Sequence, residues 1–320
     1  MNDKKRRQFN RTVFKAFPWV MGVLLIILVF LQINSNSSKA QSKSGTDSSQ
    51  QATVSSSSSE VTNKQKKIKA ELASYLKTVT KDGTVSVSFY NLGATPKSKA
   101  AASTDAAVYK PGSLVTEADA HTAQTAASTY KLFIAAYLMH QKQNGKFNWT
   151  SSNTEGFDQM IVDSANTFAD SELKSYGMAA VNKFIGSQGW YTPVFQQTVI
   201  AKTTSHSLML LLEQLAAGTG PFKNASDREK ILKLMSEQIY RTGIPAGASA
   251  AKTGTKVADK VGFLNDTNND AGIVTLPNGQ KYILVIMTHG HGQSGFSGFP
   301  KMAEITKKVQ TIVYGTNAGK

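Results

Sequence analysis

The chain has 320 residues, 40% of them hydrophobic, and contains no cysteine. This length allows one large domain or two small ones. The absence of cysteine excludes disulfides, thiolate metal sites, a cysteine nucleophile and a lipidated N-terminal cysteine. The formal net charge is +15 and is concentrated toward the N-terminal end. No basic stripe or nucleic-acid-binding motif accompanies this charge, so the sequence predicts no nucleic-acid partner.

A basic N-terminus precedes a run of apolar residues. Basic side chains crowd residues 1–16, and residues 17–33 are almost wholly apolar. A helix of the latter length reaches roughly 25 Å, the short end of a membrane span. Because basic residues remain on the cytoplasmic side, the sequence predicts a single-pass cell-membrane anchor with an extracytoplasmic C-terminal domain. A signal peptide cleaved near Ala40, which would release a secreted protein, is the alternative.

A polar tract separates the apolar run from the folded part. Residues 34–63 are rich in Ser, Gln and Thr and contain no aromatic side chain. Such a segment buries too little apolar surface to fold and predicts a flexible linker. The expected organisation is a cytoplasmic tail over 1–16, a transmembrane helix over 17–33, a disordered linker over 34–63 and a folded domain over 64–320.

The folded part opens with one helix and one strand and closes with strands and a helix. Apolar spacing predicts a helix over 66–79, and strict alternation predicts a strand over 84–90. The further expected elements are helices over 128–143, 157–166, 173–188, 205–217 and 227–240, strands over 270–275 and 281–287, and a helix over 300–314. This order predicts an α+β domain whose antiparallel sheet is built from both chain ends and packs against a helical part.

Three short polar motifs contain the candidate catalytic groups. A serine hydroxyl is a weak nucleophile unless a base lies within hydrogen-bond reach. Positions i and i+3 share one face of a helix, so a Ser-x-x-Lys motif brings the hydroxyl and the amine together. The lysine can act as a base if burial lowers its pKa. A serine that only caps a helix is the alternative. The three motifs are Ser128-Thr129-Tyr130-Lys131, Ser164-Ala165-Asn166 and Lys252-Thr253-Gly254.

Together and in this order the motifs resemble those of penicillin-binding proteins and class A β-lactamases, namely Ser-x-x-Lys, Ser-x-Asn and Lys-Thr-Gly. The segments 160–167 and 242–247 resemble this superfamily as well, and the resemblance covers roughly residues 85–314. It implies a β-lactamase/transpeptidase-like fold with the site in a cleft between the sheet and the helical part. Ala165 departs from the pattern, because aspartate is the common residue there.

The resemblance implies catalytic roles for the first two motifs. Ser128 would be the nucleophile and Lys131 its general base. Ser164 would pass a proton to the leaving nitrogen of the substrate. Asn166 would bind the amide of the substrate.

The resemblance also implies that the third motif lies on a strand that faces the cleft. Lys252 and Thr253 would hold a carboxylate of the substrate. Gly254 would let the ligand lie flat along the strand. The backbone N–H of Thr255 would complete an oxyanion hole together with that of Ser128. The sequence predicts no cofactor and no metal site, because His289-Gly290-His291 lacks a third ligand pattern.

One absence bears on turnover. Class A β-lactamases use a loop glutamate to activate the water that clears the acyl-enzyme, and residues 173–212 contain no Asp or Glu. The sequence therefore predicts a penicillin-binding, D,D-peptidase-like enzyme that acylates with peptidoglycan stem peptides or β-lactams and deacylates slowly. A true β-lactamase with a base elsewhere and a non-catalytic cell-envelope binding module on the same fold are the alternatives.

Overall fold

The structure is a computed structural model that describes residues 48–320, with side chains from residue 58 onward. Its contacts divide the chain into units 1–55 and 56–320, of which the second is the folded domain. The predicted tail and transmembrane segment lie outside the described residues. Within the described part, none of the helices combines the length and apolar character needed to cross a membrane.

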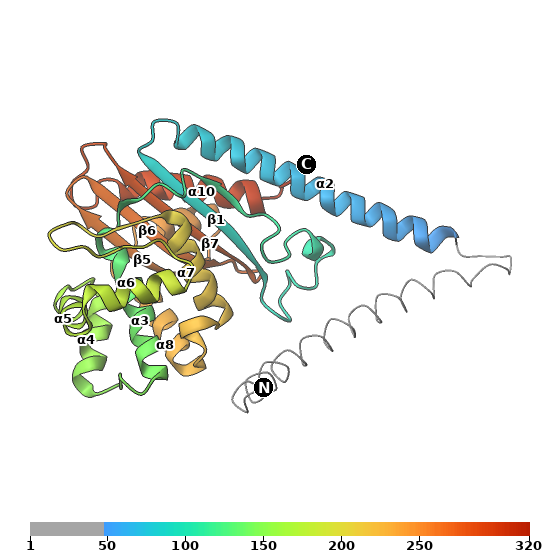
Figure 1. Ribbon diagram of the computed structural model, residues 1–320. Coiled ribbons are helices and arrows are strands. Elements are labelled where there is room, and N and C mark those ends of the chain that lie inside the picture. The colour runs from blue at the N-terminus through green and yellow to red at the C-terminus, as the bar shows by residue number, and fades with distance from the viewer. Residues whose placement is uncertain (1–47) are drawn as a thin grey trace, which may run out of the picture. The chain divides into compact units, whose positions relative to one another are not determined.

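The domain contains a five-stranded antiparallel sheet of order β2-β1-β7-β6-β5 (Figure 1). Because β1 pairs with β7, the sheet is built from both chain ends, as the sequence predicts. A separate ribbon pairs β3 with β4. The strands are β1 (Val85–Ala94), β2 (Thr116–Ala118), β3 (Gln124–Thr125), β4 (Lys202–Thr203), β5 (Lys256–Leu264), β6 (Thr267–Thr275) and β7 (Gln280–His289).

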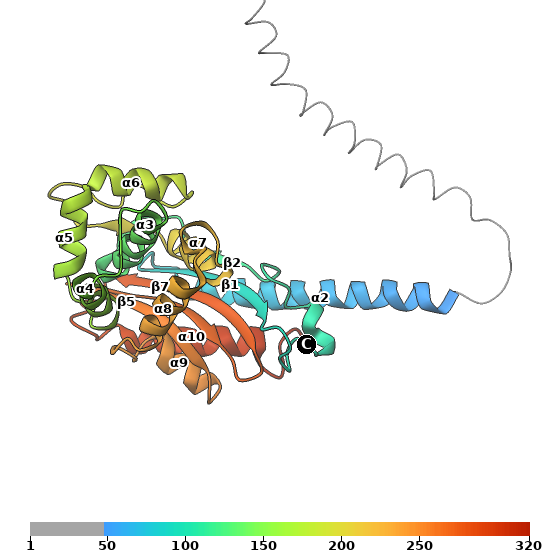
Figure 2. The ribbon, with the colours of Figure 1, turned by 90° about the horizontal axis from the view of Figure 1, so that it is seen from below.

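Helices cover both faces of the sheet. Figure 2 shows α9 and α10 on one side and α3, α6 and α7 on the other. The α-helices are α2 (Ser48–Val79), α3 (Lys131–Gln143), α4 (Ser151–Val162), α5 (Thr167–Tyr176), α6 (Met178–Ser187), α7 (Ser205–Ala217), α8 (Ala225–Ser236), α9 (Ile244–Ala251) and α10 (Phe299–Tyr314). The 3₁₀ turns are η2 (Thr104–Ala107), η3 (Ala127–Tyr130) and η4 (Gly220–Phe222).

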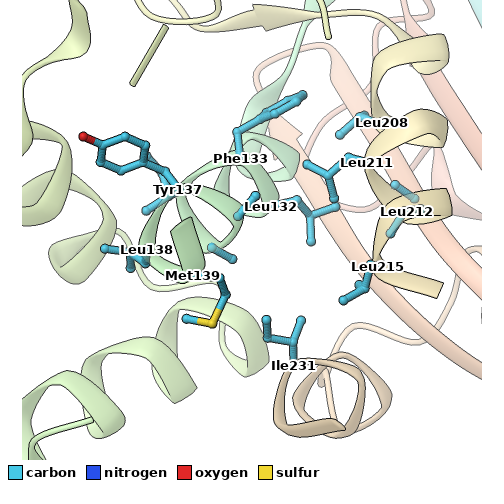
Figure 3. Close-up of a cluster of buried hydrophobic side chains, with 14 of the residues drawn as sticks. Leu132, Phe133, Tyr137, Leu138, Met139, Leu208, Leu211, Leu212, Leu215 and Ile231 are labelled. Atoms are coloured by element: carbon cyan, nitrogen blue, oxygen red, sulfur yellow. The ribbon is translucent and has the colours of Figure 1, made fainter. Parts of the chain in front are cut away.

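Two hydrophobic cores lie on opposite faces of the sheet. Side chains alternate across a strand, so Ile283 and Val285 of β7 enter the core of the helical part, whereas Leu284 and Ile286 enter the core beneath α2 and α10. Figure 3 shows side chains of α3 and α7 meeting in the first core. Each fully buried leucine stabilises the fold by about 1.5–3 kcal/mol. The buried leucines of α7 are Leu208, Leu211, Leu212 and Leu215.

Two expected elements differ from the structure, and one helix of the structure was not expected. Helix α2 begins at Ser48, so residues 48–63 are helical where the sequence predicts a linker. Its C-terminal half is anchored by buried apolar side chains, and an established helix propagates one hydrogen bond per residue. The helix expected over 173–188 is interrupted by Gly177, whose φ of 80° ends α5. Helix α9, which immediately precedes Lys252, is not among the elements that the sequence predicts.

Candidate active site

Ser128 lies in the 3₁₀ turn η3, directly before α3. The turn is fixed at its start, because Ala126 N donates to Ala201 O at 2.8 Å and the Asn269 side chain donates to Ala126 O at 3.0 Å. Ala127 has a φ of 43°, a left-handed conformation that is unfavourable for a residue with a Cβ. Backbone strain of this kind clusters at functional sites, where surrounding contacts hold it in place.

Lys131 joins the first two motifs. Its side chain is fully buried, and Nζ lies 2.8 Å from Ser128 Oγ. The same nitrogen donates to Ser164 O at 2.7 Å and to Asn166 Oδ1 at 2.6 Å. Ser164 has a φ of 60°, which turns the chain between α4 and α5 toward Lys131. The structure thus brings these four predicted site residues together.

The second lysine of the site is Lys260. It is fully buried on β5, and Nζ donates to Ser164 Oγ at 2.8 Å and to Val261 O at 3.0 Å. The sequence-based prediction instead assigned Lys252, as part of the Lys-Thr-Gly motif, to the strand that faces the cleft. That assignment is wrong, and Lys260 was missed.

The predicted third motif lies elsewhere. Lys252 caps the C-terminus of α9 and lines a separate cavity of about 490 Å³ with Pro277. Thr253 and Gly254 follow in a turn before β5, in which Thr255 N donates to Lys252 O at 3.2 Å. An N–H paired in this way does not complete an oxyanion hole. Strand residues advance about 3.3 Å each, so Lys260 lies about 13 Å along the strand from Lys256, the first residue of β5 after this turn.

Lys260-Val261-Gly262 has the Lys-x-Gly spacing that the site requires. Gly262 is needed sterically, because a Cβ there would lie 2.8 Å from Ser128 N and 2.9 Å from Thr129 N. The strand β5 therefore passes directly against the nucleophile turn. Val261 is buried in the core beneath α2 and α10 and has no hydroxyl, so the carboxylate-binding role expected of Thr253 has no counterpart at this middle position.

Burial weakens the proton affinity of both lysines. It lowers the pKa of Lys131 to about 8, an effect that the nearby carboxylate of Asp170 opposes. Burial and then the charge of Lys131 lower the pKa of Lys260 to about 7, opposed by Asp259 and Asp270. A lysine with such a pKa is present partly as the free amine near neutral pH and can accept a proton.

Ser128 opens onto a cavity of about 170 Å³. Asp170 of α5 supplies the one carboxylate of its lining and accepts a hydrogen bond from the Tyr130 hydroxyl at 3.4 Å. Asp170 is not among the site residues predicted from the sequence, and it lies just before the acid-free stretch 173–212. The lining residues are Ala127, Ser128, Tyr130, Asn166, Asp170, Ile200, Ala201, Phe263 and Leu264.

The fold and this geometry agree with a match to a family model, the β-lactamase enzyme family, over residues 151–315. The chain belongs to this family. The matched range includes Ser164, Asn166 and Lys260 and begins after Ser128. No curated protein sequence matches the chain.

Solved structures of the family share the fold. A point mutant of PBP-A in an acyl-enzyme complex with penicillin G is 19% identical, with a TM-score of 0.59, over 77% of this chain and 95% of its own. A β-lactamase from Sphaerobacter thermophilus is 16% identical, with a TM-score of 0.59, over 75% and 95%. A variant of the reconstructed last common ancestor of Gram-negative class A β-lactamases is 18% identical, with a TM-score of 0.59, over 77% and 98%.

Proposed function

We propose that the protein is a serine acyl-transferase or hydrolase of the penicillin-binding, D,D-peptidase type that forms an acyl-enzyme at Ser128. The observation that carries the proposal is the pair of contacts from Lys131 Nζ to Ser128 Oγ and from Lys260 Nζ to Ser164 Oγ. They give the nucleophile a buried amine as base and give the second serine a cationic neighbour.

In the proposed acylation, the Ser128 oxygen attacks the carbonyl carbon of the substrate amide and its proton passes to the free amine of Lys131. The C–N bond then breaks, and Ser164 Oγ delivers a proton to the leaving nitrogen. Lys260 replaces that proton through its hydrogen bond to Ser164. Water then attacks the acyl carbon and the ester C–O bond breaks. The proton held by Lys131 returns to the Ser128 oxygen, and the proton released with the acid product restores Lys260.

An oxyanion hole from Ser128 N–H and Phe263 N–H completes the proposal. Phe263 follows Gly262 on β5 and lines the same cavity as Ser128. Because β5 is the last strand of the sheet, alternate N–H groups on its outer side are not used by a neighbouring strand. Two such donors stabilise the negative charge that develops on the carbonyl oxygen.

The proposed substrates carry an amide beside a carboxylate, as in a D-alanyl-D-alanine stem peptide or a β-lactam. A substrate carboxylate beside Lys260 would raise the pKa of that lysine and restore its positive charge. The acid-free stretch 173–212 supports slow deacylation. Asp170 is the lining group that favours the alternative of a true β-lactamase, because a carboxylate in the cavity can activate water.

Intact-protein mass spectrometry after incubation with penicillin G tests the proposal. The wild type should gain one covalent adduct that persists, and Ser128→Ala should gain none. Ser152→Ala is a matched control, because Ser152 is an exposed serine of α4 that lies outside the cavity lining. Rapid loss of the adduct with release of hydrolysed penicillin would favour the β-lactamase alternative. An unmodified wild-type chain would favour the non-catalytic binding module.

We further propose that residues 17–33 anchor the catalytic domain outside the cytoplasmic membrane. The support is the order of a basic segment followed by an apolar one. Protease added to intact cells should remove the domain and leave a short membrane-bound fragment. A mature protein found free in the medium and starting at Gln41 would favour the cleaved signal peptide instead.

A further inference from the structure

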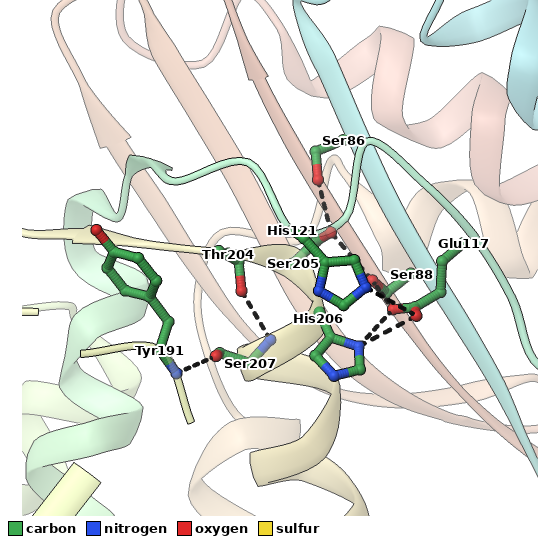
Figure 4. Close-up of polar contacts among 9 residues, drawn as sticks. All are labelled: Ser86, Ser88, Glu117, His121, Tyr191, Thr204, Ser205, His206 and Ser207. Atoms are coloured by element: carbon green, nitrogen blue, oxygen red, sulfur yellow. Dashed lines mark hydrogen bonds and ion pairs between the residues drawn. The ribbon is translucent and has the colours of Figure 1, made fainter. Parts of the chain in front are cut away.

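Figure 4 shows a cluster of side chains of the metal-ligand type. None of its three residues lines the cavity at Ser128. Glu117 comes from β2, His121 from the loop that follows it, and His206 from the first turn of α7. Each of the three residues offers one potential ligand atom, and these three atoms lie within 4.8 Å of one another. His206 Nδ1 lies 3.0 and 3.1 Å from the two carboxylate oxygens of Glu117, and His121 Nε2 lies 4.0 Å from one of them.

Buried serines orient the carboxylate of this cluster. Ser88 Oγ donates to Glu117 Oε1 at 2.7 Å, and Ser205 Oγ lies 3.0 Å from Ser88 Oγ. Both serine side chains are fully buried. Hydrogen bonds of this kind hold a ligating carboxylate in one orientation, as in the outer shell of established metal sites. The loop of His121 is fixed as well, because His206 N donates to Ala120 O at 3.1 Å.

The cluster remains open to solvent on one side. The side chain of His121 is 74% exposed, that of His206 29% and that of Glu117 19%. The two imidazole rings lie 4.3 Å apart between centroids. Ligands of a tetrahedral zinc ion are separated by about 3.4 Å, since each bond is about 2.1 Å long. A small movement of the exposed His121 ring therefore brings all three donors into a ligating arrangement.

We propose that Glu117, His121 and His206 bind one divalent transition-metal ion of the zinc type, with water in the remaining position. Two imidazoles and one carboxylate suit zinc, whereas magnesium and calcium prefer an all-oxygen set. The ion would join β2 and the following loop to the start of α7. The same loop continues through β3 into η3, so the ion would also brace the segment that leads to Ser128.

Metal titration of the full-length chain, purified without a histidine tag or chelator, tests the site. Isothermal titration with zinc should give one ion per chain, and cobalt should produce the visible absorption bands of a low-symmetry nitrogen and oxygen site. Zinc at one hundred times its Kd should raise the unfolding midpoint by about 5 °C, since it binds the folded state alone. His121→Ala and His206→Gln should each weaken binding at least about tenfold.

Two controls make the result decisive. His121→Ala alters an exposed side chain, so its melting curve without metal should match that of the wild type. His291→Ala is the matched control, because His291 belongs to the other histidine pair of the chain and contacts Thr84 and Lys301. Zinc binding should be unchanged in that variant. Absence of binding at millimolar zinc, wild-type affinity in His121→Ala, or loss of binding in His291→Ala would each overturn the proposal.

Discussion

Replacing Lys260 and Lys252 in turn tests which of these two lysines supplies the proton to Ser164. Lys260→Met preserves the length of the side chain and removes the ammonium that donates to Ser164 Oγ. Lys252→Met makes the same chemical change at the lysine of the Lys-Thr-Gly sequence, which lines a different cavity. The pair of variants therefore tests position and not the general loss of a positive charge.

The two variants should differ strongly in acylation rate. A positioned proton-transfer partner contributes about 10²–10⁴-fold, so Lys260→Met should slow acylation by that factor. Lys252→Met should remain within about twofold of the wild type, because distant sites act independently. Lys260→Met leaves the buried carboxylates of Asp259 and Asp270 without this cation, so its far-UV circular dichroism must match that of the wild type before the two acylation rates are compared.

The pH dependence of stability gives a second readout for the same variant. Burial lowers the pKa of Lys260 to about 7, whereas an unfolded lysine has a pKa of about 10.4. Between these values the unfolded state binds more protons than the folded state, so this lysine makes the free energy of unfolding rise with pH. Lys260→Met should lack this contribution and show a flatter rise between about pH 7 and pH 9.

Time-resolved labelling with a fluorescent penicillin measures the acylation rate, and urea unfolding at the two pH values measures stability. The reasoning would be refuted if Lys252→Met lost labelling while Lys260→Met retained it. If the free energy of unfolding rises with pH as steeply in Lys260→Met as in the wild type, the lowered pKa does not belong to Lys260.

Two further substitutions test the surroundings of Ser128. The carboxylate of Asp170 opposes the lowering of the Lys131 pKa, which lies at about 8. Asp170→Asn should therefore shift the acid limb of the pH–acylation profile to lower pH, and an unchanged or higher limb would contradict this. Gly262→Ala places a Cβ 2.8 Å from Ser128 N. Thermal unfolding should show destabilisation of about 1–3 kcal/mol and labelling should slow, whereas normal melting and labelling would exclude the close approach.

The parts of the site that depend on local spacing could be predicted from the sequence. Ser128 and Lys131 are three positions apart, so helical geometry alone brings them together. Two strands of the sheet also followed from local pattern, because β1 alternates apolar and polar residues and β7 is a short continuous apolar run. Burial of Lys131 was required by the chemistry, and the structure has it fully buried.

The parts that depend on tertiary packing could not be predicted in this way. Asp170 lines the cavity because α5 packs against α3 and α4, and no spacing rule links it to Ser128. The Glu117, His121 and His206 cluster joins residues that are distant in sequence across β2 and α7. Helix α9 was missed because its eight residues include Pro and Gly, which weaken any helical pattern.

The error over the third motif has a specific physical origin. Lys252 and Gly254 have the same spacing as Lys260 and Gly262, so the letters alone do not distinguish them. In a strand, residues two apart share a face. A lysine and a glycine with this spacing therefore both face Ser128 only if they lie on β5, the strand that passes against the nucleophile turn. Pairing of β5 with β6 proceeds outward from the turn at Asn265, which has a φ of 50°. Strand β5, counted back from that turn, includes Lys260 and Gly262. Lys252 and Gly254 come before its first residue.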